Sequence, residues 1–157
     1  MRCPSFIPIG FISLVFALAL ISKASAEPEE ALFVGAKACE SCHSDQYASF
    51  MSNSNKAHSW KSLSKMLPKL TPSEQSDCFA CHTTGYGKSG GFESLEKTPH
   101  LANLSCESCH GPGSVHVESG DKNDILCTPD VKSCTICHNA ERVQNFKFKP
   151  MLYHGGH

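Results

Sequence analysis

The residues of this chain that are best placed to do chemistry are cysteines and histidines that recur in one five-residue pattern. Two cysteines separated by two residues are followed at once by a histidine, and the pattern occurs four times. The motifs are Cys39, Cys42 and His43; Cys78, Cys81 and His82; Cys106, Cys109 and His110; and Cys134, Cys137 and His138. This is the pattern of c-type haem attachment, in which two thiols form thioethers with the vinyl groups of one haem. The histidine that follows binds the iron as its proximal ligand.

Zinc is the alternative cofactor for such cysteine pairs, since two pairs can surround one Zn²⁺ tetrahedrally. Two zinc sites would explain the spacing of the cysteines, but not the histidine that follows every pair. Four repeats of the longer pattern within 157 residues also leave little room for coincidence. The sequence therefore predicts four covalently bound c-type haems, with iron as the metal.

The far side of each iron needs a second ligand or stays open. Histidines outside the motifs are the candidates: His58, His100, His116, His154 and His157. Their abundance favours bis-histidine iron over the methionine–histidine pairs that raise the reduction potential. His58 and His116 each lie one loop from a motif, and His154 is preferred to the chain-terminal His157 because chain ends fray. His100 fits a ligand and a surface residue equally well.

Cys127 is the cysteine of the C-terminal half that no motif uses. A free thiol, an intermolecular disulfide and an unusual iron ligand are all compatible with an unpaired cysteine in an oxidising compartment. The preferred interpretation is a buried thiol beside the haem of the fourth motif.

The first 26 residues have the pattern of a secretory signal peptide. Arg2 is followed by an apolar run over Phe6–Ile21 and then by Ala24-Ser25-Ala26, a small-x-small cleavage signature. The uninterrupted apolar part, Phe11–Ile21, is shorter than a transmembrane helix, although an uncleaved anchor is the alternative. We expect cleavage after Ala26 and export to the periplasm, which leaves residues 27–157 as one tetrahaem cytochrome c domain that is not an integral membrane protein.

Little polypeptide remains to build that domain. Shared among four haems, it is too short for an ordinary apolar core around each one, so the haems themselves must form the core. We expect a mostly α fold with short helices and long loops, in which no strand is predicted. Helices are predicted over 33–65 with a break at 53–55, over 73–77 with Ser73 or Thr71 as cap, and over 131–139. A flexible glycine-rich loop is predicted over 83–91, and Gly111-Pro-Gly113 should stop any helix after the third motif.

Several segments resemble the tetrahaem cytochrome c-554 family. They are 33–43 with Lys56-Ala-His58, 78–92, 106–114 and 134–139 with the later His154. The resemblance implies a mostly α-helical periplasmic electron carrier whose haems form stacked pairs. It also implies that His58, His116 and His154 are distal ligands and that the His82 haem is five-coordinate. His100, between the second and third motifs, is a residue that could close that open site.

These patterns favour a protein that transfers electrons between redox partners in a respiratory chain. No acid–base constellation surrounds a motif, so no catalytic residue is assigned and an enzymatic role is the less favoured reading. The alternatives are a subunit of a larger respiratory complex or haem filament, and a small oxidoreductase or nitric-oxide-binding protein that acts at the His82 haem. The sequence has no basic cluster of the kind that indicates nucleic-acid binding. The electron donor, the electron acceptor and the oligomeric state stay open.

Overall fold

The computed structural model describes residues 30–139. The signal peptide predicted for residues 1–26, the predicted ligand His154 and the less favoured candidate His157 therefore lie outside the described residues. Within 30–139 the chain forms helices and loops and no strand, which confirms the predicted fold class. No helix in this part of the chain is long and apolar enough to cross a membrane.

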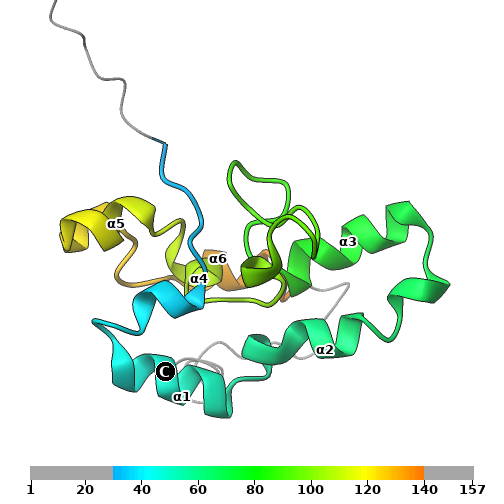
Figure 1. Ribbon diagram of the computed structural model, residues 1–157, viewed down its shortest axis with the longest axis horizontal. Coiled ribbons are helices and arrows are strands. Elements are labelled where there is room, and N and C mark those ends of the chain that lie inside the picture. The colour runs from blue at the N-terminus through cyan, green and yellow to red at the C-terminus, as the bar shows by residue number, and fades with distance from the viewer. Residues whose placement is uncertain (1–29, 140–157) are drawn as a thin grey trace, which may run out of the picture.

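The elements are short. The α-helices are α1 Ser44–Asn53, α2 Ser59–Leu63, α3 Pro72–His82, α4 Glu107–His110, α5 Ser114–Ser119 and α6 Val131–Thr135. The 3₁₀ turns are η1 Ala36–Cys39, η2 Asn55–His58, η3 Leu67–Lys69, η4 Pro99–Leu101 and η5 Lys122–Asp124. Figure 1 shows α2 and α3 side by side at one end of the molecule and α5 at the other.

Helix α3 begins where the sequence predicted but continues further. Thr71 accepts from the backbone N–H of Glu74, whose carboxylate accepts from the N–H of Thr71, and Pro72 occupies the first turn. This capping box satisfies donors that the first turn leaves unpaired. The predicted end at residue 77 was wrong: no helix-breaking residue lies before Thr83, so the helix carries the second motif in its last turns.

The segment from 33 to 65 is broken as predicted at residues 53–55. Ser54 is extended and buried, and its hydroxyl accepts from the N–H of Lys56, which caps η2. The chain therefore forms two helices here, α1 and α2, instead of one. Elsewhere, α4 ends before Gly111, whose φ of +83° is in the left-handed region that glycine adopts without strain, so the predicted stop is also confirmed.

The apolar core of the described residues is small. Its buried members are Phe33, Phe92, Leu101 and Ala102, against which Trp60, Phe79 and Tyr86 pack. The Trp60 and Phe79 rings stack with their centroids 5.9 Å apart, joining α2 to α3. One such cluster is little for a chain of this length, which agrees with the expectation that cofactors supply most of the core.

The predicted flexible loop over 83–91 is folded back on itself. Thr84 donates its N–H to the carbonyl of Leu101 and accepts from the N–H of Phe92. At Gly85, with φ of +70°, a Cβ would lie 2.6 Å from the Phe33 ring. The glycines here therefore permit close packing, and the loop holds the aromatic cluster in place.

Candidate haem sites

Each motif lies on a single helical turn. In the first, third and fourth motifs the N–H of the histidine donates to the carbonyl of the first cysteine, at 2.9, 3.0 and 2.9 Å. The second motif occupies the C-terminal part of α3. Positions i, i+3 and i+4 of a helical turn share one face, so both thiols and the imidazole are presented together. This is why the two-residue spacing and the adjacent histidine suit one planar cofactor.

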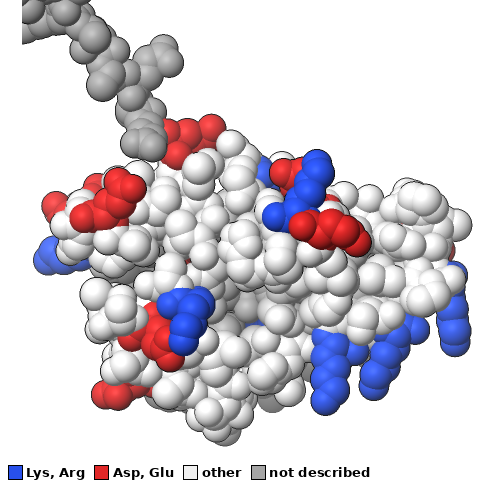
Figure 2. Space-filling model, viewed as in Figure 1, with Lys and Arg blue, Asp and Glu red and all other residues white. Residues whose placement is uncertain are grey.

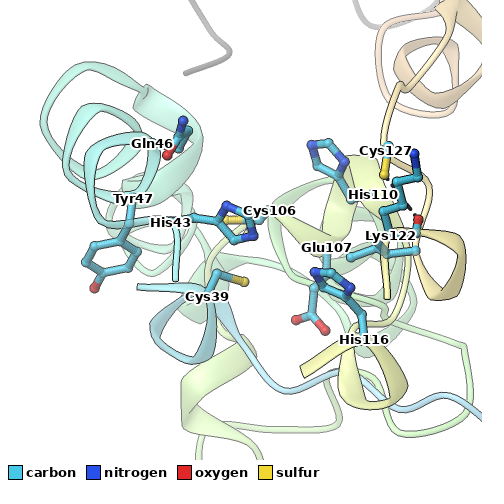
Figure 3. A pocket seen from close by; sticks show the side chains of 11 residues that line it. Cys39, His43, Gln46, Tyr47, Cys106, Glu107, His110, His116, Lys122 and Cys127 are labelled. Atoms are coloured by element: carbon cyan, nitrogen blue, oxygen red, sulfur yellow. Dashed lines mark hydrogen bonds between the residues drawn. The ribbon is translucent and has the colours of Figure 1, made fainter. Parts of the chain in front are cut away.

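Two cavities bring the motifs together in pairs. The first, of about 300 Å³, takes Cys39 and His43 from the first motif and Cys106 and His110 from the third (Figure 3). The remaining residues that line it are Gln46, Tyr47, Glu107, His116, Lys122, Ile125 and Cys127. Motifs that are far apart in the sequence thus share one space.

The second cavity, of about 430 Å³, unites the second and fourth motifs. Its motif residues are Cys78, Cys81, His82, Cys137 and His138. Polar side chains of α2, η2 and α3 complete its wall, among them Lys56, Ser59 and Asp77.

The pKa shifts of the thiols indicate which cysteines influence one another. Cys39 and Cys106 share a side-chain hydrogen bond, which raises the pKa of Cys39 and lowers that of Cys106. Burial, followed by the nearby Cys81, raises the pKa of Cys137 to about 12. Cysteines of different motifs therefore influence each other in both cavities, and Cys109 of the third motif also interacts electrostatically with Cys134 and Cys137 of the fourth.

Backbone carbonyls orient several of the histidine rings. Nδ1 of His110 lies 2.6 Å from the Leu126 carbonyl, Nδ1 of His116 lies 2.8 Å from the Asp121 carbonyl, and Nδ1 of His82 lies 3.4 Å from that of Ser59. A carbonyl only accepts, so Nδ1 carries the proton and a neutral ring keeps its lone pair on Nε2. These are the partners that fix the tautomer of metal-binding histidines.

The rings of His43 and His116 face each other across the first cavity. Their centroids are 6.2 Å apart and their planes differ by 23°. Two imidazoles that bind one metal ion from opposite sides, each through a nitrogen about 2 Å from the metal, have ring centres roughly 6 Å apart. His43 and His116 are thus spaced as two residues that would hold one haem iron between them.

Burial, followed by the charge of Lys56, lowers the pKa of His138. The shift favours the neutral ring, which is the form that binds a metal.

His58 and His100 are not brought to either cavity. His58 is exposed, and its Nε2 lies 2.8 Å from the Met51 carbonyl. His100 packs on the backbone before the first motif, where a Cβ at Gly35 would lie 3.2 Å from its ring. Neither residue lines the cavity that contains His82, and their roles as ligands stay predictions.

Cys127 is not where the sequence analysis placed it. Its side chain is exposed and lines the cavity of the first and third motifs, rather than being buried beside the fourth. The thiol donates to the Lys122 carbonyl at 3.1 Å. That hydrogen bond joins Cys127 to the first residue of η5 and keeps its side chain at this cavity.

Glu107 is a residue of the site that the sequence analysis missed. Its carboxylate is 2% exposed and accepts from the N–H groups of Val34, Gly35 and Gly113 at 3.0, 2.7 and 2.8 Å. It therefore ties the chain before the first motif to the third motif. The sequence offered no signal for this role, because Glu40 occupies the same place in the first motif and is partly exposed.

Within residues 30–139, no three histidine, cysteine, aspartate or glutamate side chains converge as a bound metal ion would require. A structural zinc site needs four such ligands. A haem instead needs two thiols and a histidine on one turn beside an apolar space, and the four motifs fit it.

Comparisons with known proteins agree with this chemistry. The family model for cytochrome c554 and c-prime matches residues 38–111. Cytochrome c-554 of Nitrosomonas europaea is 34% identical over 108 residues, which are 62% of this chain and 46% of that protein. The solved structure of reduced cytochrome c554 from N. europaea matches with a TM-score of 0.59 and 27% identity, covering 82% of this chain and 86% of that one. The chain thus aligns with less than half of the curated relative's length.

A helical fold that carries four Cys-x-x-Cys-His turns around two shared cavities defines a multihaem c-type cytochrome. The chain is similar to the cytochrome c-554 family over residues 38–111, and its cofactors are four covalently bound c-type haems.

Proposed function

We propose that this cytochrome transfers electrons between redox partner proteins in the periplasm as part of a respiratory chain. The observation that carries the proposal is the pairing of motifs, because each cavity is lined by cysteines and histidines of two motifs. Cofactors held by such neighbouring turns are close enough to exchange electrons. When bound, the haems supply reversible one-electron chemistry at iron. Export would follow from the signal peptide proposed for residues 1–26.

The chain's own residues attach, orient and shield the cofactors. We assign each pair of motif cysteines to one haem and His43, His82, His110 and His138 to the proximal positions. Carbonyl partners accept from Nδ1 of three of the histidine rings, so Nε2 is the nitrogen that would bind iron. His116 is assigned as the distal partner of His43, and His58 and His154 as the distal ligands of two further haems.

Replacing His116 with alanine should remove one axial ligand from the first haem. The 6.2 Å separation of its ring from that of His43 predicts one more high-spin iron per molecule than in the parent protein, in the electron paramagnetic resonance spectrum of the oxidised sample. His100→Ala is the matched control, since that ring lies against Gly35 and outside both cavities. A spectrum of His116→Ala that matched the parent's would contradict the assignment, whereas a new high-spin signal from His100→Ala would show that His100 is itself a ligand.

A second candidate function, the binding of a small ligand such as nitric oxide, is favoured by the second cavity. His138 is the only other histidine among the described residues that line the cavity of His82, and it belongs to the fourth motif. No methionine lines that cavity within the same residues. The His82 haem would then have an open side.

Reductive titration of the holoprotein tests the leading proposal. A carrier should take up four electrons reversibly, one for each motif, as the haem absorbance changes from the oxidised to the reduced form. Failure to cycle would contradict it. The spin state of the oxidised sample then separates the two candidates: a purely low-spin spectrum supports a simple carrier. A high-spin component that shifts with nitric oxide supports a ligand site at His82.

A further inference from the structure

One edge of the molecule is basic although the chain as a whole is not. The formal net charge of the chain is −1, yet residues 55–70 contain four lysines and no aspartate or glutamate. Three of these, Lys61, Lys65 and Lys69, are exposed and lie on α2, on the turn after it and on η3. We call these three residues the lysine edge. Figure 2 shows lysine side chains projecting side by side from this edge.

Two lysines elsewhere on the described surface are paired with acids. Lys37 pairs with Glu40, and Lys97 pairs with Glu93 at 2.6 Å. Among residues 30–139, no acidic side chain forms an ion pair with the lysine edge. Exposed acids lie both at the far end, on α5 and η5, and on the neighbouring α3, where Glu74 and Asp77 are found. The lysine edge is therefore a local basic surface of the described residues (Figure 2).

The lysine edge adjoins the cavity of the second and fourth motifs. Ser59 and Ser62 of α2 line that cavity, and Lys61 lies between them on the same short helix. Lys56, from the same basic segment, also lines the cavity. A protein that docked on the lysine edge would thus be placed next to this pair of motifs and away from His43 and His110.

We propose that the lysine edge is the docking surface for an acidic one-electron redox protein, and that electrons pass to or from the chain at the second and fourth motifs. This inference rests on the proposed function. Opposite charges on two partners raise the rate of encounter, and exposed rim charges affect the association rate and its salt dependence more than the final affinity. The local positive charge of the lysine edge would favour encounters of such a partner at this surface.

The test uses the haem-loaded cytochrome and fully reduced flavodoxin, a small acidic protein. Flavodoxin loses one electron as its anionic flavin hydroquinone becomes the neutral semiquinone, and the cytochrome gains that electron. The Lys61→Glu/Lys65→Glu variant is compared with Lys88→Glu/Lys97→Glu, which changes the net charge equally on exposed residues elsewhere. At low salt we expect the second-order rate constant of the first variant to fall about tenfold, within the range of electrostatic steering. The control should change it less than about twofold.

Raising the ionic strength to about 1 M should bring both variants to the rate of the parent protein, because screening shortens the range of the charges to about 3 Å. Equal losses in both variants would mean that only net charge matters and would overturn the proposal. It would also be overturned if the lysine-edge variant kept its flavodoxin rate but lost binding to phosphatidylglycerol vesicles, since the surface would then face a membrane.

Reduction by methyl viologen radical, a small cation, separates this inference from the proposed function. Both variants should accept electrons from it at least as fast as the parent. If the parent protein took electrons from neither reagent, the carrier function itself would fail. If it took them from both with no dependence on the lysine edge, only the docking surface would fail.

Discussion

Replacing both Cys39 and Cys42 with alanine is expected to remove one haem of the four and to destabilise the whole domain. The buried apolar cluster of the described residues contains only a few side chains, so a missing cofactor leaves a cavity that nothing else can fill. We expect the free energy of unfolding to fall by more than about 4 kcal/mol, beyond the usual range of single substitutions. The haem-to-protein ratio and guanidinium denaturation followed by circular dichroism measure the two effects.

Cys127→Ala is the control for this experiment. It removes a cysteine from the wall of the same cavity, but one that is exposed and outside every motif. Its haem content and denaturation midpoint should match the parent protein. A Cys39→Ala/Cys42→Ala protein that lacked one haem yet kept the parent's midpoint would show that the haems are not the core of the domain.

The features that sequence analysis predicted well are local ones. The cap of α3 depends on Thr71, Pro72 and Glu74, which lie within four positions. The end of helix α4 after the third motif depends on Gly111. The motif itself is a local device, because both cysteines and the histidine lie on one helical turn. Such features follow from backbone chemistry that neighbouring residues decide.

The pairing of motifs could not be predicted in the same way. His43 and His116 are separated by most of the described chain, yet their rings face each other in one cavity. Cys127 was misplaced for the same reason: its closeness in sequence to the fourth motif suggested that location, whereas the turn through Lys122 brings it to the first and third. Which distant motifs meet in one cavity depends on the tertiary arrangement, and the spacing of the motifs along the sequence does not determine it.

The first and third motifs show this limit most clearly, since both read Cys-Glu-Ser-Cys-His. After the first, α1 continues the chain at Ser44, and Glu40 turns outward to pair with Lys37. After the third, Gly111 reverses the chain and brings the N–H of Gly113 back to Glu107. Identical pentapeptides therefore place one carboxylate in solvent and the other in the interior.

Glu107→Gln is consequently expected to destabilise the protein strongly, although it changes few atoms. The carboxylate accepts from Val34 and Gly113 at Oε1 and from Gly35 and the Ser105 hydroxyl at Oε2. An amide keeps one acceptor and turns an NH₂ group toward donors at the other position. Each buried donor left without a partner costs about 1–3 kcal/mol, so we expect a loss of about 3 kcal/mol in guanidinium denaturation of the holoprotein.

Glu40→Gln provides a control in the identical pentapeptide. Its salt bridge with Lys37 joins side chains that are 78% and 38% exposed, and surface pairs of this kind contribute at most about 1 kcal/mol. Hydrogen exchange gives an independent readout, because the amides of Val34 and Gly35 should exchange faster in Glu107→Gln and keep the parent rate in Glu40→Gln. Equal denaturation midpoints and equal exchange in the two variants would show that Glu107 does not hold the first motif against the third. The packing of the first motif against the third would then have to depend on the haems alone.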